Sequence, residues 1–377
     1  MIYVHVPFCQ SRCAYCDFYS TTGKEELKAQ FVEAACREIA ARAEELPNAG
    51  DVRSIYFGGG TPSLLGLELI ERLIACLKKH FEVRPNAEIT LEANPNDVTK
   101  TYAKGLRDLG VNRVSLGVQS FDERCLQLIR RRHTSAEAKQ AVEFLSEVGF
   151  ENLSIDLIYG LPGQNLESWL RDIKEAFALP IKHLSAYALS IEDSTPLGRW
   201  LTEGKVKQTD EEFFLKEYEV LLDEAARAGF EHYEISNFCR PGFHSRHNSA
   251  YWDGTPYLGI GPGAHSFNGK IRRANLPNLE AYMLKPDKPP HELEELREEE
   301  KFNERVFLSL RTKNGLDLHQ MRKNFPQKWI ADMELAAKPH VKAGRLEREN
   351  KGNLRLTRKG LFVSDDVMSD LMRVEGI

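Results

Sequence analysis

The chain has 377 residues, of which 42% are hydrophobic and 28% charged, so it is long enough for two or three domains and unlike a disordered or fibrous chain. Its 51 basic and 56 acidic residues give a net charge of −5, which does not predict a nucleic-acid-binding surface. No apolar run reaches the roughly 18 residues that span a bilayer, and residues 1–7 lack the features of a signal peptide. We therefore expect a cytoplasmic protein with no nucleic-acid partner and no integral membrane segment.

The first 228 residues alternate short apolar segments with amphipathic ones. The apolar segments have strand length and occupy residues 2–6, 54–57, 88–92, 113–118, 153–157 and 183–189. The segments with helical periodicity occupy residues 25–42, 67–79, 100–108, 135–148, 166–176 and 209–228. This alternation predicts an α/β fold with a parallel sheet, and six units without G-x-G-x-x-G favour a partial TIM-type (β/α)6 barrel over a doubly wound sheet.

Several helix ends are also predicted. Asn165-x-x-Ser168 is typical of a helix start, and Thr209 to Glu212 fits a capping box. Gly110 and Gly149 stand where two of the helices should end.

Three regions are expected along the chain. Residues 1–230 form the barrel, and residues 231–290, rich in aromatic residues, Gly and His, close it. Residues 285–300 hold a Pro-rich joint and an acidic run, which predict a linker and a solvated helix face. Residues 291–377 form a mainly helical, winged-helix-like domain with a hairpin around residues 350–353; without a basic stripe, we interpret it as a packing module.

Three of the seven cysteines stand together directly after the first predicted strand. Cys9, Cys13 and Cys16 form a C-x3-C-x2-C motif. Four-iron clusters ordinarily take four cysteines, so three would leave one iron open to a small molecule. The alternatives are a structural zinc site with His5 as fourth ligand, or a loop of unligated cysteines. The odd total makes a disulfide framework a poor explanation.

This motif, followed by Gly58-Gly59-Gly60-Thr61-Pro62, resembles the radical S-adenosylmethionine (SAM) superfamily. The resemblance implies that the three cysteines hold a [4Fe-4S] cluster and that SAM chelates the fourth iron. Taken alone, the glycine segment is more typical of a tight turn between a strand and a helix.

Polar groups follow the next predicted strands at corresponding places. They are Glu92 to Pro95, Gly117 to Phe121 and the segment from Asp156 to Gly163. The carboxyl ends of barrel strands meet at one mouth, where a site is expected. Glu92, Asp156 and Gln119 could accept hydrogen bonds from hydroxyl groups, and Arg131 could bind a carboxylate. Singly, each is more typical of a loop group or a surface charge.

The same segments, together with Tyr3-x-His5-x-Pro7-Phe8-Cys9, resemble the oxygen-independent coproporphyrinogen III oxidase subgroup. The resemblance implies SAM contacts at Tyr3, Tyr15, Gly59, Gly60, Thr61, Glu92, Gln119, Arg131 and Asp156. Two departures are informative: Phe18 stands where the oxidase has a fourth cysteine, and Cys9 follows the chain start almost at once. Both are typical of the haem chaperones of this subgroup.

A further element of those chaperones stands at residues 247–252, with His247, Asn248, Tyr251 and Trp252 as haem candidates. A neutral imidazole is a good axial ligand for haem iron, and Tyr and Trp offer flat faces to a porphyrin. The segment could equally be an aromatic core with a hydrogen-bonded histidine. His244, His265 and Cys239 are rival ligands.

The resemblance thus predicts a haem chaperone that carries a [4Fe-4S] cluster with exchangeable SAM. Its partners would be haem, haem-acceptor apoproteins and a second copy in a homodimer, and no catalytic residue is assigned. The alternatives are an oxygen-independent coproporphyrinogen III dehydrogenase and a radical SAM enzyme for another substrate.

Overall fold

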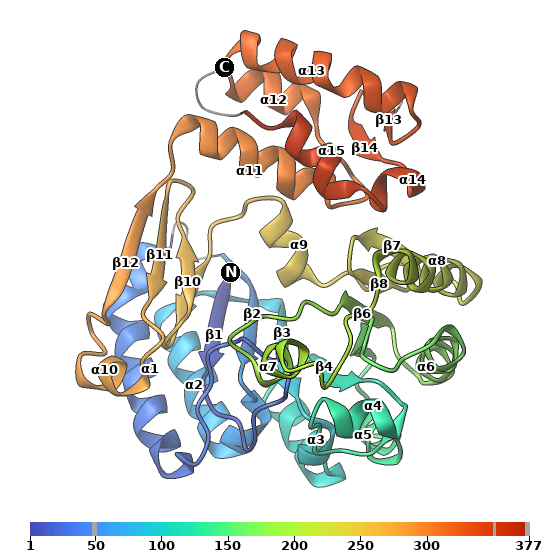
Figure 1. Ribbon diagram of the computed structural model, residues 1–377. Coiled ribbons are helices and arrows are strands. Elements are labelled where there is room, and N and C mark those ends of the chain that lie inside the picture. The colour runs from blue at the N-terminus through green and yellow to red at the C-terminus, as the bar shows by residue number, and fades with distance from the viewer. Residues whose placement is uncertain (47–50, 350–351, 374–377) are drawn as a thin grey trace. The chain divides into compact units, whose positions relative to one another are not determined.

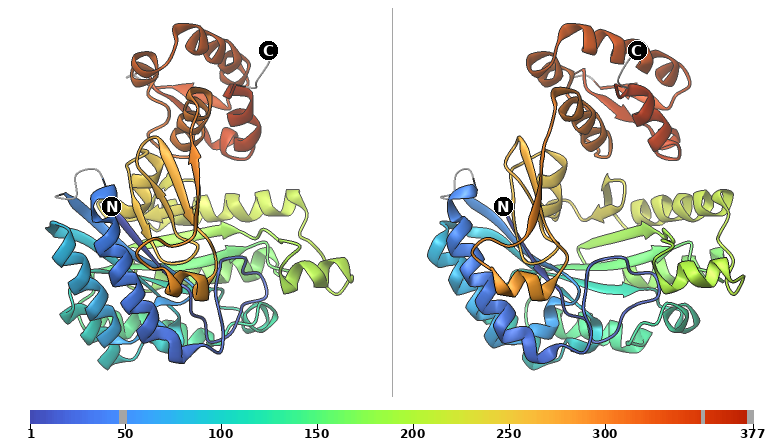
Figure 2. Two further views of the ribbon diagram at one scale, coloured as in Figure 1. Left: turned by 90° about the vertical axis from the view of Figure 1, so that its left-hand side faces the viewer. Right: turned by 60° about the vertical axis from the view of Figure 1, so that its left-hand side comes forward.

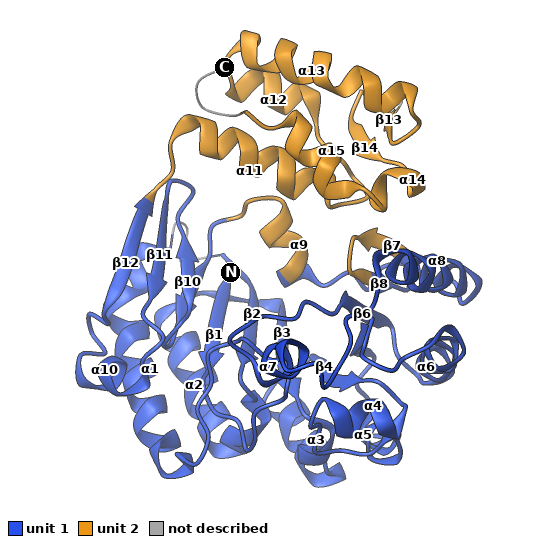
Figure 3. Cartoon of the chain, viewed as in Figure 1, with its two compact units in different colours: residues 1–231, 238–247, 256–294 blue, residues 232–237, 248–255, 295–377 orange. Residues whose placement is uncertain are grey.

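The computed structural model describes residues 1–46, 51–349 and 352–373. The chain forms two compact units (Figure 3). The first comprises residues 1–231, 238–247 and 256–294, and the second comprises residues 232–237, 248–255 and 295–377. The unit boundaries therefore cross the aromatic segment that follows residue 230 more than once.

The first unit is built on a parallel sheet (Figure 1). In the described residues of this unit the strand order is β8-β6-β5-β4-β3-β2-β1-β9, a linear order without closure. The strands are β1 Ile2–Val6, β2 Val52–Gly59, β3 Val83–Ala93, β4 Arg113–Gln119, β5 Asn152–Tyr159, β6 His183–Ala188, β8 Asn237–Cys239 and β9 Leu258–Ile260. Strand β7 Glu231–Glu234 belongs, apart from its first residue, to the second unit. Neighbours from β1 to β6 pair in parallel, so the predicted partial barrel with six repeating strands is confirmed.

The helices that follow these strands along the chain are α1 Lys28–Arg42, α2 Leu67–His80, α3 Lys100–Asp108, α4 Glu123–Leu128, α5 Ser135–Glu147, α6 Leu166–Ala178, α7 Pro196–Thr202 and α8 Glu211–Arg227, with the short helices η1 Glu25–Leu27, η2 Ala43–Glu45, η3 Pro62–Leu65 and η4 Pro95–Asp97. Helices α1, α2, α3, α5 and α6 lie against the outside of the sheet (Figures 1 and 2). In α2, Ile70, Leu73 and Leu77 are fully buried at helical spacing, which explains why this segment packs as a helix.

Most predicted helix ends are confirmed. Asn165 and Ser168 form a reciprocal capping box at the start of α6. Gly110 and Gly149 follow their helices with φ of 92° and 91°, a conformation that suits glycine. The prediction that Thr209 begins a capping box is wrong, because Asp210 accepts the backbone N–H of Phe213 as N-cap and Thr209 instead donates to the carbonyl of Gly160.

The strand β9 is a feature that the sequence analysis did not predict. It pairs in parallel with β1, with Ile2 opposite Leu258. A buried ion pair on α1 holds it: Arg42 lies 2.6 Å from Glu38 and donates to the carbonyl of Gly259 at 2.9 Å. Three residues with a central glycine carry too little strand signal on their own, so this strand depends on its neighbours.

A small antiparallel sheet also belongs to the first unit. It contains β10 His265–Phe267, β11 Ile271–Asn275 and β12 His291–Glu295, and helix α10 Leu279–Leu284 lies between β11 and β12 along the chain. The prediction of a linker and a solvated helix face at residues 285–300 is therefore wrong in part, because residues 291–295 extend a sheet and a helix begins only at Glu298.

The second unit contains α11 Glu298–Leu310, α12 Leu318–Asn324, α13 Gln327–Lys342, β13 Leu346–Arg348, β14 Leu354–Leu356, α14 Arg358–Leu361 and α15 Ser364–Leu371. Phe302, Ile330 and Leu354 lie in its apolar core. The predicted hairpin pairs Leu346 with Leu356, although residues 350 and 351 of its turn lie outside the described residues. None of the helices in the described part of the chain is both long and apolar enough to cross a membrane.

Candidate functional site

The cysteine motif occupies a loop between β1 and η1 that the protein fixes at several points. The N–H of Cys9 donates to the carbonyl of Thr21 at 2.9 Å, which closes the loop at its base. Ala14, between the second and third cysteines, is fully buried and donates its N–H to the carbonyl of Ile129 at 3.0 Å. Because the middle of the loop is anchored in the core, the flanking cysteines are held at the surface of a cavity.

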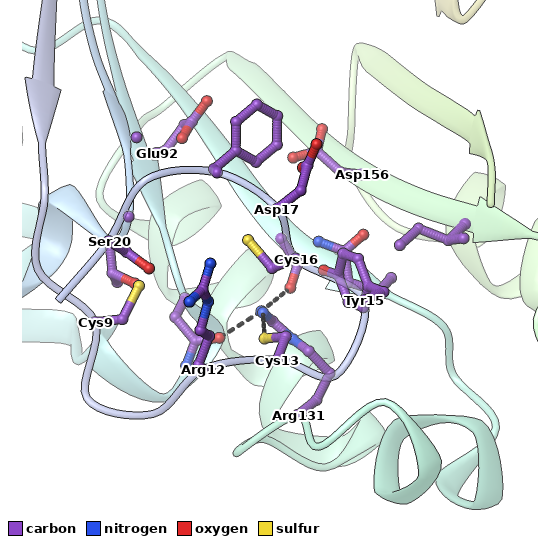
Figure 4. Close-up of a pocket in the computed structure, with 18 of the residues that line it drawn as sticks. Cys9, Arg12, Cys13, Tyr15, Cys16, Asp17, Ser20, Glu92, Arg131 and Asp156 are labelled. Carbon is purple, nitrogen blue, oxygen red and sulfur yellow. Dashed lines mark hydrogen bonds between the residues drawn. The ribbon is translucent and has the colours of Figure 1, made fainter. Parts of the chain in front are cut away.

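This cavity has a volume of about 460 Å³ and opens at the carboxyl ends of β2 to β6. Figure 4 shows Cys9, Cys13 and Cys16 on one side of it, with Glu92, Asp156 and Arg131 coming from the strand ends and the turn after α4. All of the predicted SAM residues except Tyr3 line it: Tyr15, Gly59, Gly60, Thr61, Glu92, Gln119, Arg131 and Asp156. The structure thus brings them together, and SAM binding by them stays a prediction.

Two of the thiols have polar neighbours in the cavity wall. Thr61 donates its hydroxyl to Cys9 Sγ at 3.5 Å, and Arg131 Nη1 lies 3.2 Å from Cys13 Sγ. Burial raises the pKa of Cys16 to about 11, so this thiol would become a thiolate only with a cation or a metal beside it.

The three cysteines suit a cluster better than a single metal ion. Among the described residues, no three His, Cys, Asp or Glu side chains are arranged to hold one ion. A zinc ion needs its sulfurs about 2.3 Å from one point, whereas a cluster offers a separate iron to each sulfur. The spread of the thiols around one open cavity therefore fits three ligands of a cluster.

Arg131 is the central cation of the site. Besides approaching Cys13, it donates through Nη2 to Asn94 Oδ1 and to the carbonyl of Gly117, both at 2.5 Å. Burial works against the charge, but Tyr15 and Cys13 outweigh it and raise the pKa of Arg131, so the guanidinium stays charged. Among the described residues, its buried Nε has no hydrogen-bond partner.

Two carboxyl groups form the opposite wall. Tyr56 donates its hydroxyl to Glu92 Oε1 at 2.7 Å, and Ser115 donates to Asp156 Oδ1 at 3.2 Å. Burial raises the pKa of Glu92 to about 7 and also raises that of Asp156. Carboxyl groups that are costly to ionise gain most from a ligand that brings hydroxyl or ammonium donors.

The glycines of the turn after β2 are required by the protein itself. A Cβ on Gly60 would lie 2.7 Å from the carbonyl oxygen of Phe8 and 3.1 Å from Cys9 Sγ. Gly59 has φ of 114°, and its Cβ would lie 2.8 Å from the ring of His5. The turn can approach the cysteine loop only without side chains, whatever else it binds.

Gln119 enters the cavity through a strained turn. It has φ of 71°, and the register between β4 and β5 shifts between Gly117 and Gln119. Asp172 on α6 holds this turn from behind, accepting the Ser120 hydroxyl at 2.6 Å and the Phe121 N–H at 2.9 Å. Sequence analysis missed Asp172, and also Ser115, because a polar residue in an amphipathic helix or a strand has no distinctive local pattern.

Tyr3 does not line the cavity. Its hydroxyl lies 3.1 Å from His5 Nδ1, and its ring stacks on Tyr56 with 6.2 Å between centroids. Tyr56 in turn donates to Glu92, so Tyr3 supports the wall of the site from behind.

The haem candidates lie on α9 Arg246–Trp252, and none of them lines the cavity. His247 is buried with 1% exposure, its Nδ1 is 3.0 Å from Ser54 Oγ, and its N–H donates to Glu88. Burial lowers the pKa of its imidazole to about 3, so it is neutral. The guanidinium carbon of Arg311 lies 5.3 Å from the centroid of the Trp252 ring. Both residues belong to the second unit, as do Asn248 and Tyr251.

Comparison with known proteins agrees with this architecture. The radical SAM superfamily model matches residues 3–176, and the HemN C-terminal domain model matches residues 296–363. The coproporphyrinogen III oxidase (HemN) structure from Escherichia coli superimposes with a TM-score of 0.84 at 24% identity, covering 98% of this chain and 89% of that one. The open parallel sheet with its three-cysteine loop is that of a radical SAM protein.

Curated relatives narrow the family. The heme chaperone HemW of Lactococcus lactis is 37% identical over 86% of this chain and 84% of its own length. The heme chaperone HemW of Mycobacterium tuberculosis is 36% identical over 98% of this chain and 94% of its own length. A mitochondrial radical SAM domain-containing protein 1 from Bos taurus is 33% identical over 98% of this chain and 87% of its own length. The chain belongs to the HemW family of radical SAM proteins.

Proposed function

We propose that this protein binds haem and transfers it to acceptor apoproteins, and that it carries a [4Fe-4S] cluster on Cys9, Cys13 and Cys16. The observation that supports the cluster most is the cavity, in which three thiols, one cation and two carboxyl groups from separate strand ends face a common space. Relatives that cover nearly the whole chain are named haem chaperones.

When bound, the cluster would offer one iron to the amino and carboxylate groups of SAM. The chain's own residues would then do the positioning. Arg131 would offset the negative charge of the ligating thiolates, and it binds Asn94 and the carbonyl of Gly117, which orders the turn. Glu92 and Asp156 would accept donors from SAM, and Gln119 would contribute its amide.

Phe18 distinguishes this cavity from that expected of an oxidase. It lines the cavity at the position where the oxidase motif has a fourth cysteine, and its side chain is 65% exposed. A benzyl group supplies neither a metal ligand nor a proton. Exchange of SAM, rather than oxidation of a porphyrin precursor, is therefore the function that we assign to the cavity.

For haem we propose His247, with a condition. The residue is enclosed by Ser54 and Glu88, so iron could reach its imidazole only after these contacts break. His265, at the start of β10, is already exposed and is the accessible rival. His244 is partly exposed, whereas Cys239 is buried.

One anaerobic experiment tests the assignment. Protein reconstituted with iron and sulfide is titrated with haem, and in parallel it is incubated with coproporphyrinogen III, SAM and a reductant. We expect about one haem per chain, as for one axial site, and little conversion of coproporphyrinogen III. Rapid formation of protoporphyrinogen IX without haem binding would establish the alternative enzyme instead. Light scattering on the same sample checks the expected homodimer.

A further inference from the structure

Two cysteines outside the cavity lie next to each other on neighbouring helices. Cys36 is on α1 and Cys76 is on α2, and Figures 1 and 2 show these helices side by side. Cys76 Sγ lies 3.5 Å from the carbonyl oxygen of Cys36, and Cys36 Sγ lies 4.0 Å from that of Arg72. Both thiols are partly exposed.

The two thiols differ in their chemistry. The neighbouring Cys76 thiol lowers the pKa of Cys36 against the effect of burial, and the nearby charge of Arg72 lowers it further. The neighbouring Cys36, together with burial, raises the pKa of Cys76. Cys36 is thus the more readily ionised partner, the arrangement of an attacking thiol with a resolving thiol beside it.

We propose that Cys36 and Cys76 form a reversible disulfide by exchange with a low-molecular-weight disulfide such as glutathione disulfide. The Cys36 sulfur attacks one glutathione sulfur, the glutathione S–S bond breaks, and a mixed disulfide remains on Cys36. The Cys76 sulfur then attacks Cys36 and releases the second glutathione. The protein dithiol loses two electrons, one glutathione disulfide becomes two glutathione molecules, and the two thiol protons end on them.

The position of the pair gives this exchange a structural consequence. Along the chain, α1 comes after the cysteine loop and α2 comes after the turn of Gly58 to Thr61. A disulfide would join the two helices that follow the thiol and glycine segments of the cavity. Neither Cys36 nor Cys76 lines that cavity, so the proposal does not depend on haem transfer.

The test uses the full chain purified without oxygen. It is incubated with glutathione disulfide, its remaining thiols are alkylated, and it is digested with trypsin. We expect residues 29–37 and 73–78 to appear as one linked peptide that reducing agent separates, with the iron content unchanged. Recovery of both peptides alkylated, or of glutathione retained on Cys36, would overturn the proposal.

Two single variants distinguish the roles of the pair. In Cys76→Ser, glutathione should stay on Cys36, because nothing resolves the mixed disulfide. In Cys36→Ser, modification of Cys76 should be about tenfold slower than that of Cys36 in the unmodified chain. Cys125 is the internal control, because it is buried and burial raises its pKa to about 12. Equal alkylation rates for Cys36 and Cys125 would contradict the assigned reactivity.

Discussion

In the cavity, the polar groups of Glu92, Asp156 and Arg131 are left partly exposed around an open space, whereas on α9 the imidazole of His247 is enclosed and already hydrogen-bonded. Both regions bring together chemistry-bearing side chains from distant parts of the sequence. The cavity can receive a ligand without rearrangement of these groups, since Glu92, Asp156 and Arg131 already line the open space. The α9 segment must first break a contact with Ser54, so its binding is coupled to a conformational change.

The largest effect is expected from Cys13→Ser. Losing one of three thiolates should reduce iron and sulfide to below about a tenth of the unmodified content after anaerobic reconstitution. Far-UV circular dichroism should stay unchanged, because Cys13 is partly exposed and lies outside the apolar core. Cys76→Ser is the matched control and should keep its iron. Full iron in Cys13→Ser would remove this residue as a ligand.

A smaller effect is expected from Arg131→Lys. The lysine keeps the charge but cannot reach Cys13, Asn94 and Gly117 together, so SAM affinity should fall about 10- to 100-fold in calorimetry. Arg124→Lys, at an exposed position on α4, should bind SAM normally. An unchanged affinity in Arg131→Lys would show that the forked guanidinium geometry is not needed.

Glu92 should give the cavity a measurable pH dependence. Its pKa is about 7 when folded and near 4.5 when unfolded, so the unfolded chain releases the proton first as pH rises. Without SAM, stability should therefore decrease from about pH 4.5 through pH 7, by about 1 kcal/mol after allowance for the open cavity. Urea titrations of Glu92→Gln should lack this loss, while exposed Glu147→Gln should retain it. If stability changed with pH equally in both variants, Glu92 would not be the group responsible.

His247 should show the opposite dependence. Its folded pKa is about 3, below the ordinary 6.5, so stability should be lost as pH falls from about 6.5 toward 3. His247→Ala should lower the free energy of unfolding by about 1–2 kcal/mol through the lost contact with Ser54. The variant should also lose less stability than the unmodified chain as the pH falls. If His247 binds iron, its loss also shifts the haem Soret band, whereas a shift only in His265→Ala would assign the ligand to β10.

Sequence reasoning reached the cavity because its residues stand at the ends of predicted strands. Once a parallel sheet is inferred, Glu92, Gln119 and Asp156 must come near one another. The same reasoning missed Asp172, which holds the Gln119 turn from another element, and the strand β9, whose three residues are fixed by Arg42. Such features depend on contacts between distant segments, which local periodicity does not contain.

The order of amino acids by itself determined the repeating strands and helices and the spacing of the three cysteines, because each is a local or periodic property of the sequence. Only the tertiary structure decided that Tyr3 stands behind the cavity wall, that His247 is buried against Ser54, and that Cys36 meets Cys76. The exposure of a side chain and its contact partners depend on the residues packed around it, and those residues come from segments far apart in the chain.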